Sequence, residues 1–336
     1  MLKRIFLYYA CILHLLVAYF TIIPAKLDAQ ASQYFGEKTV VRLIPPKDKK
    51  MRLLIVSDAT NEIDDIWAIS LAILYPERFI IEGFVGSNYD HTGSGIGPKS
   101  IDLSVKEIQL LLEKAGMKGR YPVYPGGHPM QYEFQPSPSA GCDFIIERAM
   151  AGTPQDPLWI VGLGAATDLA SAYLKEPAIR DRVVFFWHGR THPTWPYRAV
   201  NYNVKGDMHA ARMLFHAPLP LILFDTGTNL FAGDMEESSK YIRPFGELGQ
   251  YLFDYRLKHA AWSKKDKAMF DLGDIAVLID PDIGKWEQSV CPTVSYYMDY
   301  NFYKTNGCML RCLDIDREKT YRLLYDRISR IKASLQ

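Results

Sequence analysis

Acidic and amide side chains gather directly after one short apolar run of the chain. Leu53–Val56 has the length and composition of a buried parallel strand. No Lys or Arg lies among the four carboxylates that follow it, so these groups repel one another unless a cation neutralises them. Carboxylate oxygens suit Ca²⁺ or Mg²⁺, so the group predicts a metal or catalytic site. Its members are Asp58, Asn61, Glu62, Asp64 and Asp65.

Each of these acids also has an ordinary interpretation. Asp64 is a good helix-capping residue, Asp65 is favourable near the positive end of a helix, and Asp58 alone is typical of a loop. The spacing is not that of an EF-hand, because the alternating ligands, the central glycine and the closing glutamate are absent. Taken together, in one short loop after a buried strand, the acids favour a metal or catalytic site.

Two further polar segments are candidates for the same site. One is Asn201-Tyr-Asn203, and the other is Asp271-Leu-Gly-Asp274. Each alone is typical of a loop followed by a helix cap, since Asp207 and Asp274 are both good N-cap residues. Amide side chains are both donors and acceptors, so the first segment suits the hydroxyl groups of a sugar.

A glycine-containing segment in the middle of the chain resembles a dinucleotide-binding loop only in part. Gly162 and Gly164 follow an expected strand and fit the first two glycines of that fingerprint. Thr167 stands where the third glycine or an alanine is expected. The next expected strand, Val183–Trp187, ends in His188 and not in an acid that could hold a ribose. A tight turn between strand and helix is therefore the favoured interpretation, and an NAD-dependent enzyme is a remote third hypothesis.

The elements that must position these side chains alternate between strand-like and helix-like patterns. This alternation predicts one α/β domain, Rossmann-like, with a mostly parallel central sheet flanked by helices. Open sheets of this kind bind ligands at the carboxyl ends of their strands, where the acids are expected. Strands are expected at residues 52–56, 80–85, 122–124, 158–161, 183–187 and 219–224, and helices at 65–75, 100–115, 144–151, 167–174, 208–215, 244–265 and 317–333.

Composition supports a folded, nearly neutral protein. The chain has 336 residues, of which 48% are apolar and 13% aromatic, which is ample for a core. Its formal net charge of +1 gives no electrostatic reason to expect nucleic acid or an anionic membrane as a partner.

The first 29 residues have the pattern of a secretory signal peptide. Lys3 and Arg4 precede the apolar run Ile5–Ile23, and a cleavage site follows, placed here after Ala29. The run is also long enough to stay as a membrane anchor, but the small residues that follow favour cleavage and export, periplasmic or secreted. Residues 30–50 are expected to form an N-terminal arm, and residues 51–333 the single domain.

Four cysteines remain after such a cleavage, an even number for an exported chain. Either two of them form a disulfide, most simply Cys308 with Cys312, or the cysteines are buried free thiols. Their spacing matches no zinc motif.

The ordered set of motifs resembles the inosine–uridine-preferring nucleoside hydrolase superfamily over about residues 51–330. The loop Val56-Ser-Asp58-Ala-Thr-Asn61-Glu62-Ile-Asp64-Asp65 resembles the family's Asp-x-Asp…Asp-Asp signature, in a variant form with Asn-Glu-x-Asp-Asp. The further matches are Pro122-Val-Tyr-Pro-Gly126, Gly162-Leu-Gly164-Ala-Ala-Thr167-Asp168-Leu-Ala170, Val183–Gly189, Asn201-Tyr-Asn203-Val with Asp207, Ala210 and Ala211, and Leu313-Asp-Ile-Asp316.

The resemblance implies a nucleoside hydrolase fold, a bound Ca²⁺ and hydrolysis of the N-glycosidic bond of ribonucleosides or related N-ribosides. It implies that Asp58 takes a proton from a water that calcium activates. The partner would be a small-molecule nucleoside or N-riboside, in a chain that is a monomer or a homo-oligomer. The implied calcium ligands are Asp58, Asp65, the Leu163 carbonyl and Asp274, and the implied substrate contacts are Asp64, Asn61, Asn88, Asn201 and Asn203.

The chain departs from the family pattern at several of these positions. Val56 replaces the first Asp of the signature, and Asn61 and Glu62 are added within it. Gly273 and Asn201 stand where many members have His and Glu. These departures motivate a second hypothesis, a sugar- or nucleoside-binding protein of the same fold with altered catalysis.

Overall fold

The computed structural model describes residues 44–89, 97–189, 194–225, 235–259 and 267–331. The signal peptide and most of the N-terminal arm lie outside these residues, so both stay predictions. None of the helices in the described ranges is long and apolar enough to cross a membrane.

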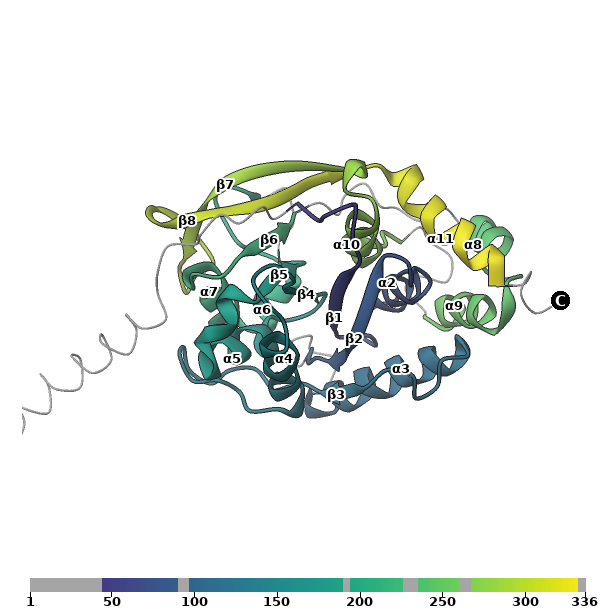
Figure 1. The fold of residues 1–336 in the computed structure, drawn as a ribbon, viewed down its shortest axis with the longest axis horizontal. Helices are drawn as coiled ribbons and strands as arrows, with labels where there is room; N and C mark the ends of the chain where they lie inside the picture. The colour runs from purple at the N-terminus through teal and green to yellow at the C-terminus, as the bar shows by residue number, and fades with distance from the viewer. Residues whose placement is uncertain (1–43, 90–96, 190–193, 226–234, 260–266, 332–336) are drawn as a thin grey trace, which may run out of the picture.

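The described residues form one eight-stranded sheet with helices on both faces (Figure 1). The strands are β1 (Met51–Ser57), β2 (Phe79–Gly86), β3 (Val123–Pro125), β4 (Leu158–Gly162), β5 (Val183–Trp187), β6 (Leu221–Phe224), β7 (Gly284–Val294) and β8 (Tyr300–Ile315). The helices are α2 (Asp64–Ile73), α3 (Ser100–Lys114), α4 (Ala140–Met150), α5 (Thr167–Lys175), α6 (Tyr202–Gly206), α7 (Met208–His216), α8 (Met235–Tyr241), α9 (Gly246–Lys258), α10 (Phe270–Ile279) and α11 (Arg317–Ile331).

The strand order across the sheet is β3-β2-β1-β4-β5-β6-β8-β7. Every neighbouring pair is parallel except β7 and β8, which pair antiparallel at one edge. The expected α/β fold with a mostly parallel central sheet is confirmed. β1 lies inside the sheet between β2 and β4, so the loop that follows it opens at the middle of the carboxyl edge.

Alternate residues of β1 enter two separate cores. Leu53 and Ile55 pack under α2, α3, α10 and α11, while Leu54 and Val56 pack under α4, α5 and α7. Because both faces of the strand are covered, its sequence is continuously apolar and not alternating. α2 is apolar all round because it is covered on every side, with all ten of its residues buried and α3, α10 and α11 packed against it.

Three expectations about the elements need correction. The long β7–β8 hairpin was not expected, because its strands are neither continuously apolar nor cleanly alternating. α9 ends at Lys258 and begins after Pro244, so the expected helix to Lys265 is too long within the described residues. α10 begins at Phe270, four residues before Asp274. Asp274 therefore lies inside the helix and does not cap it.

The cysteine question is settled by the fold. Cys142, Cys291, Cys308 and Cys312 are all free thiols in the structure. Cys308 and Cys312 lie on the same strand, β8, where the extended backbone keeps residues four apart well separated. The expectation of buried free thiols holds for three of them, and Cys308 is partly exposed.

Candidate metal centre and active site

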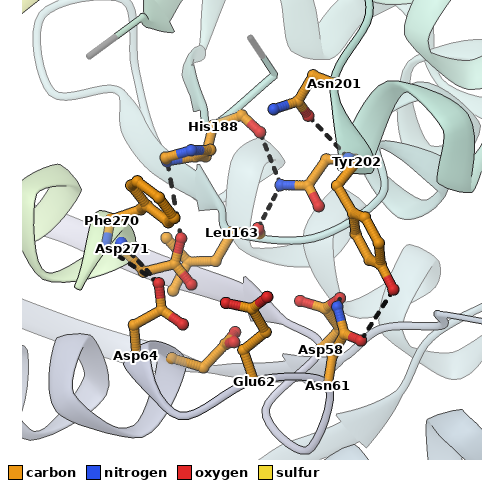
Figure 2. Close-up of a pocket in the computed structure, with 12 residues that line it drawn as sticks. Asp58, Asn61, Glu62, Asp64, Leu163, His188, Asn201, Tyr202, Phe270 and Asp271 are labelled. Carbon is orange, nitrogen blue, oxygen red and sulfur yellow. Dashed lines mark hydrogen bonds and ion pairs between the residues drawn. The ribbon is translucent and has the colours of Figure 1, made fainter. Parts of the chain in front are cut away.

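A pocket opens where the carboxyl ends of β1, β4 and β5 meet the first turns of α6 and α10 (Figure 2). Asp58, Leu163 and His188 are each the first residue after one of these three parallel strands. The side chains that line the pocket are Asp58, Asn61, Glu62, Asp64, Asp65, Leu163, His188, Asn201, Tyr202, Asn203, Phe270 and Asp271. The fold thus brings together the opening acidic loop and both of the other polar segments.

Three carboxylates form the centre of this acidic group. One ligand oxygen from each of Asp64, Asp65 and Asp271 lies within 4.8 Å of the others. Burial raises the pKa of Asp65 to about 7, and the charge of Asp64 adds to the shift. Burial also raises the pKa of Asp271 well above its usual range, with further contributions from Asp64 and Asp65. Burial and mutual repulsion thus disfavour the charged forms of these carboxylates as long as no cation is bound.

Asp58 lies in the same acidic group and is fixed by Asn61. It is 3% exposed, and its Oδ2 accepts a hydrogen bond of 3.0 Å from Asn61 Nδ2. Asn61 Oδ1 in turn accepts from the hydroxyl of Tyr202 at 3.4 Å, which ties the loop to α6. Burial, followed by the charge of Asp65, raises the pKa of Asp58 well above its usual value. A carboxylate with a raised pKa is a stronger base than an ordinary aspartate.

Asp64, an expected substrate contact, lines the pocket and also contacts the start of α10. Its Oδ2 accepts from the backbone N–H of Phe270 at 3.0 Å and lies 3.5 Å from that of Asp271. Its Oδ1 lies 3.3 Å from the ammonium of Lys267. Asp64 therefore caps the first turn of α10 from another helix, and this contact places Asp271 beside Asp65.

The asparagines of the second segment organise the opposite wall. Asn201 Oδ1 accepts from the backbone N–H of Asn203 at 2.7 Å and so caps α6. Asn203 Nδ2 donates to the carbonyls of Leu163 at 2.6 Å and His188 at 2.7 Å. The Leu163 carbonyl has a second lone pair, which stays available to a cation in the pocket.

Asp274, which the resemblance implied as a calcium ligand, lies one helical turn behind Asp271. It is fully buried, and its Oδ2 is 2.8 Å from His188 Nδ1. Burial raises its pKa to about 6, while the His188 contact acts in the opposite direction. Its Oδ1 is buried with no hydrogen-bond partner in the described residues. Asp271 and not Asp274 lines the pocket, although His188, Asp271 and Asp274 also lie close enough to form a second possible ligand group.

Asn88 lies outside the pocket lining. It is fully buried, and its Nδ2 donates to the carbonyl of Gly127 at 2.8 Å and to Thr167 Oγ1 at 3.1 Å. These contacts hold the loop after β3 against α5. The structure thus brings Asn61, Asn201 and Asn203 to the pocket and leaves Asn88 in the layer behind it.

Gly164 has a steric reason to be glycine. A Cβ atom at this position would lie 2.8 Å from Asp58 Oδ1 and 2.7 Å from Ser87 Oγ. Both distances are shorter than van der Waals contact allows, so only glycine lets the loop after β4 approach the acid. The partial likeness to a dinucleotide loop is explained by this close approach.

The residues present fit a divalent cation. The pocket is lined by five carboxylates and the Leu163 carbonyl, all hard oxygen donors of the kind that Ca²⁺ and Mg²⁺ prefer. The basic groups that the structure pairs with them are His188 and Lys267. Buried carboxylates without enough positive charge are costly, and a bound cation removes that cost.

Fold and site together define a class of protein: an α/β protein with an acidic pocket, able to hold a cation, at the carboxyl edge of its sheet. Residues 55–321 match the family model of the inosine-uridine preferring nucleoside hydrolases. The chain therefore belongs to this family, whose members are metal-dependent N-glycosyl hydrolases that act on small-molecule nucleosides.

Solved structures with similar folds are named as nucleoside or ribonucleoside hydrolases. A plant nucleoside hydrolase, PpNRh1, is 16% identical with a TM-score of 0.65, and the match covers 84% of this chain and 99% of that one. A purine-preferring ribonucleoside hydrolase from Gardnerella vaginalis is 17% identical with a TM-score of 0.63, over 84% and 99% of the two chains. An inosine-guanosine nucleoside hydrolase is 15% identical with a TM-score of 0.66, over 83% and 98%. At these low identities, the structural matches establish a shared fold. A search of curated proteins finds no match.

Proposed function

We propose that the chain hydrolyses the N-glycosidic bond of ribonucleosides or related N-ribosides in a calcium-dependent reaction. The observation that carries this proposal is the cluster of buried carboxylates at the carboxyl ends of β1 and β4, next to amides suited to a sugar. Family membership supports the reaction type, and the pocket chemistry supports the ion.

The proposed ligands are Asp58, Asp65, Asp271 and the Leu163 carbonyl. Asp271 takes the place that the resemblance gave to Asp274, because Asp271 faces the pocket and Asp274 is paired with His188. A set made only of carboxylate and carbonyl oxygens favours calcium over a softer metal that binds through nitrogen or sulfur. The ligand group that includes His188 is less suitable, because its Nδ1 is already engaged by Asp274.

The reaction needs a base, a stabiliser of positive charge and sugar contacts. When bound, the cation orients the attacking water and lowers its pKa. Asp58 accepts the proton of that water, with its carboxylate held in place by Asn61. As the nucleobase departs, the sugar ring becomes positively charged, and the surrounding carboxylates stabilise that charge. Asn201 and Asn203 lie on the wall where hydroxyl groups of the sugar need donors and acceptors.

Replacing Asp58 by Asn tests the catalytic assignment. Asparagine keeps the shape and the Asn61 contact but cannot accept the proton, so turnover of a nucleoside should fall by about 100-fold or more. The measurement is the rate of ribose release by wild type and Asp58→Asn at saturating calcium, with calcium affinity measured in parallel. A variant that keeps wild-type turnover would exclude Asp58 as the base.

The same variant separates the enzyme from a binding protein of the same fold. The altered signature, with Val56 and Asn201 in place of family acids, motivates that alternative. A binding protein would bind nucleoside with little change in Asp58→Asn and would release no ribose in either form. Turnover by the wild-type chain excludes it.

A further inference from the structure

An ion pair between the inserted Glu62 and the buried Lys267 lies beside the pocket. Lys267 Nζ is 2.6 Å from Glu62 Oε2 and donates to the carbonyl of Ala268 at 2.6 Å. The ammonium also lies 4.7 Å from the centre of the Phe270 ring. Lys267 is 2% exposed, so its ammonium is held by protein contacts and not by solvent. These contacts fix the position of the Glu62 carboxylate from one side.

Asp64, which the family resemblance implies as a sugar contact, already has partners inside the protein. Its Oδ2 caps α10, and its Oδ1 faces the same Lys267 ammonium at 3.3 Å. Each oxygen of Asp64 therefore already has a partner inside the protein. A sugar hydroxyl that displaced either contact would loosen the start of α10 and with it Asp271.

Glu62 is more accessible to a ligand than Asp64, because 38% of its side chain is exposed against 4% for Asp64. The Glu62 carboxylate points into the pocket between Asp64 and Asp58 (Figure 2). Its Oε2 is held by Lys267. An ionised carboxylate only accepts hydrogen bonds, so its natural partner in the pocket is a donor on the ligand.

We propose that Glu62, positioned by Lys267, accepts hydrogen bonds from the sugar hydroxyls of the substrate, and that Asp64 instead anchors α10. The assignment rests on the proposed function in one respect, namely that a riboside is the ligand. An N–H group on the leaving base is a donor of the same chemistry, so the experiment has separate arms for sugar and base.

The test measures binding of D-ribose, 2-deoxy-D-ribose and hypoxanthine to the full chain with calcium present. Glu62→Gln should weaken D-ribose by about 10- to 100-fold, the usual range for losing a hydrogen bond to a charged group. It should also reduce the preference for ribose over deoxyribose and leave hypoxanthine unchanged. The control is Glu147→Gln, on the exposed side of α4, which should bind all three as wild type does.

Unchanged ribose affinity in a folded Glu62→Gln chain would overturn the assignment, and so would a loss confined to hypoxanthine. A chain that binds ribose through Glu62 but releases none from any nucleoside would contradict the proposed function and leave this assignment standing. If the chain hydrolysed a nucleoside but bound ribose equally well without Glu62, the proposed function would stand and this assignment would fail.

Lys267 is a positioning residue in this scheme, and a double-mutant cycle tests it. Lys267→Met should reduce the preference for ribose, and combining it with Glu62→Gln should cause little further loss, because both changes remove the same contact. Lys267→Arg should restore part of the preference, since it keeps the charge. Fully additive losses, or an unchanged preference in Lys267→Met, would show that Lys267 has only a structural role.

Discussion

At the residue scale, the site depends on acids whose separate roles the sequence does not distinguish. Asp58, Asp64 and Asp65 were identifiable from one loop, since four carboxylates without a basic neighbour are unusual. The separate role of each acid was not identifiable, because Asp64 contacts a backbone N–H group 206 positions away in the sequence. Lys267 gave no signal in the sequence, because its partners belong to another element.

The ligand set can be tested by comparing two aspartates of α10. Asp271→Asn should weaken calcium binding by more than about 100-fold, because it removes a carboxylate that faces the cluster. Asp274→Asn should cost less than about tenfold, because Asp274 contacts His188 and acts at a distance from the ion. Calorimetric titration with calcium measures both. A greater loss in Asp274→Asn than in Asp271→Asn would reverse the assignment.

The raised pKa values predict how stability depends on pH. Between an ordinary aspartate pKa of about 4 and the value of about 7 for Asp65, the folded chain holds more protons than the unfolded chain. The stability of the metal-free protein should therefore fall as pH rises through this window, and bound calcium should offset the loss. Thermal unfolding at pH 4.5 and 7.5, with calcium and with chelator, measures this. If calcium raised Tm by the same amount at both pH values, the prediction would be contradicted.

At the element scale, strand ends and helix starts place the chemistry. The apolar run of β1 and the order of strands and helices were sufficient to predict the sheet and the edge where the pocket lies. The start of α10 was misplaced because Asp274 is a good cap residue, although Leu272, Ile275, Ala276 and Ile279 already show helical spacing. The β7–β8 hairpin has no such periodic signal, since one face of its strands is only partly covered.

The close approach of the β4 loop to β1 predicts that Gly164→Ala is damaging. The added methyl group collides with Asp58 and Ser87, so stability should fall by about 1–3 kcal/mol and nucleoside turnover should fall with it. Gly119→Ala is the control. It has a φ of +70° and open space around it, so it costs backbone strain but leaves turnover unchanged. Wild-type turnover in Gly164→Ala would show that the loop can retreat without moving Asp58.

At the scale of the whole molecule, a mostly parallel sheet covered on both faces holds the acidic pocket at the carboxyl ends of its central strands. The β1 loop, the β4 and β5 ends and the first turn of α10 come from positions spread over more than 200 residues, and only the fold brings them together. Family membership indicates the reaction type. The inserted Asn61 and Glu62, with Lys267 paired to Glu62, add contacts of this chain's own pocket.

The most direct test of the central claim is ribose release by the purified chain from a panel of purine and pyrimidine ribonucleosides. The account predicts free ribose from at least one nucleoside, loss of that activity on chelation, and its return when calcium is added. No ribose from any nucleoside, in a folded chain shown by titration to hold calcium, would contradict it.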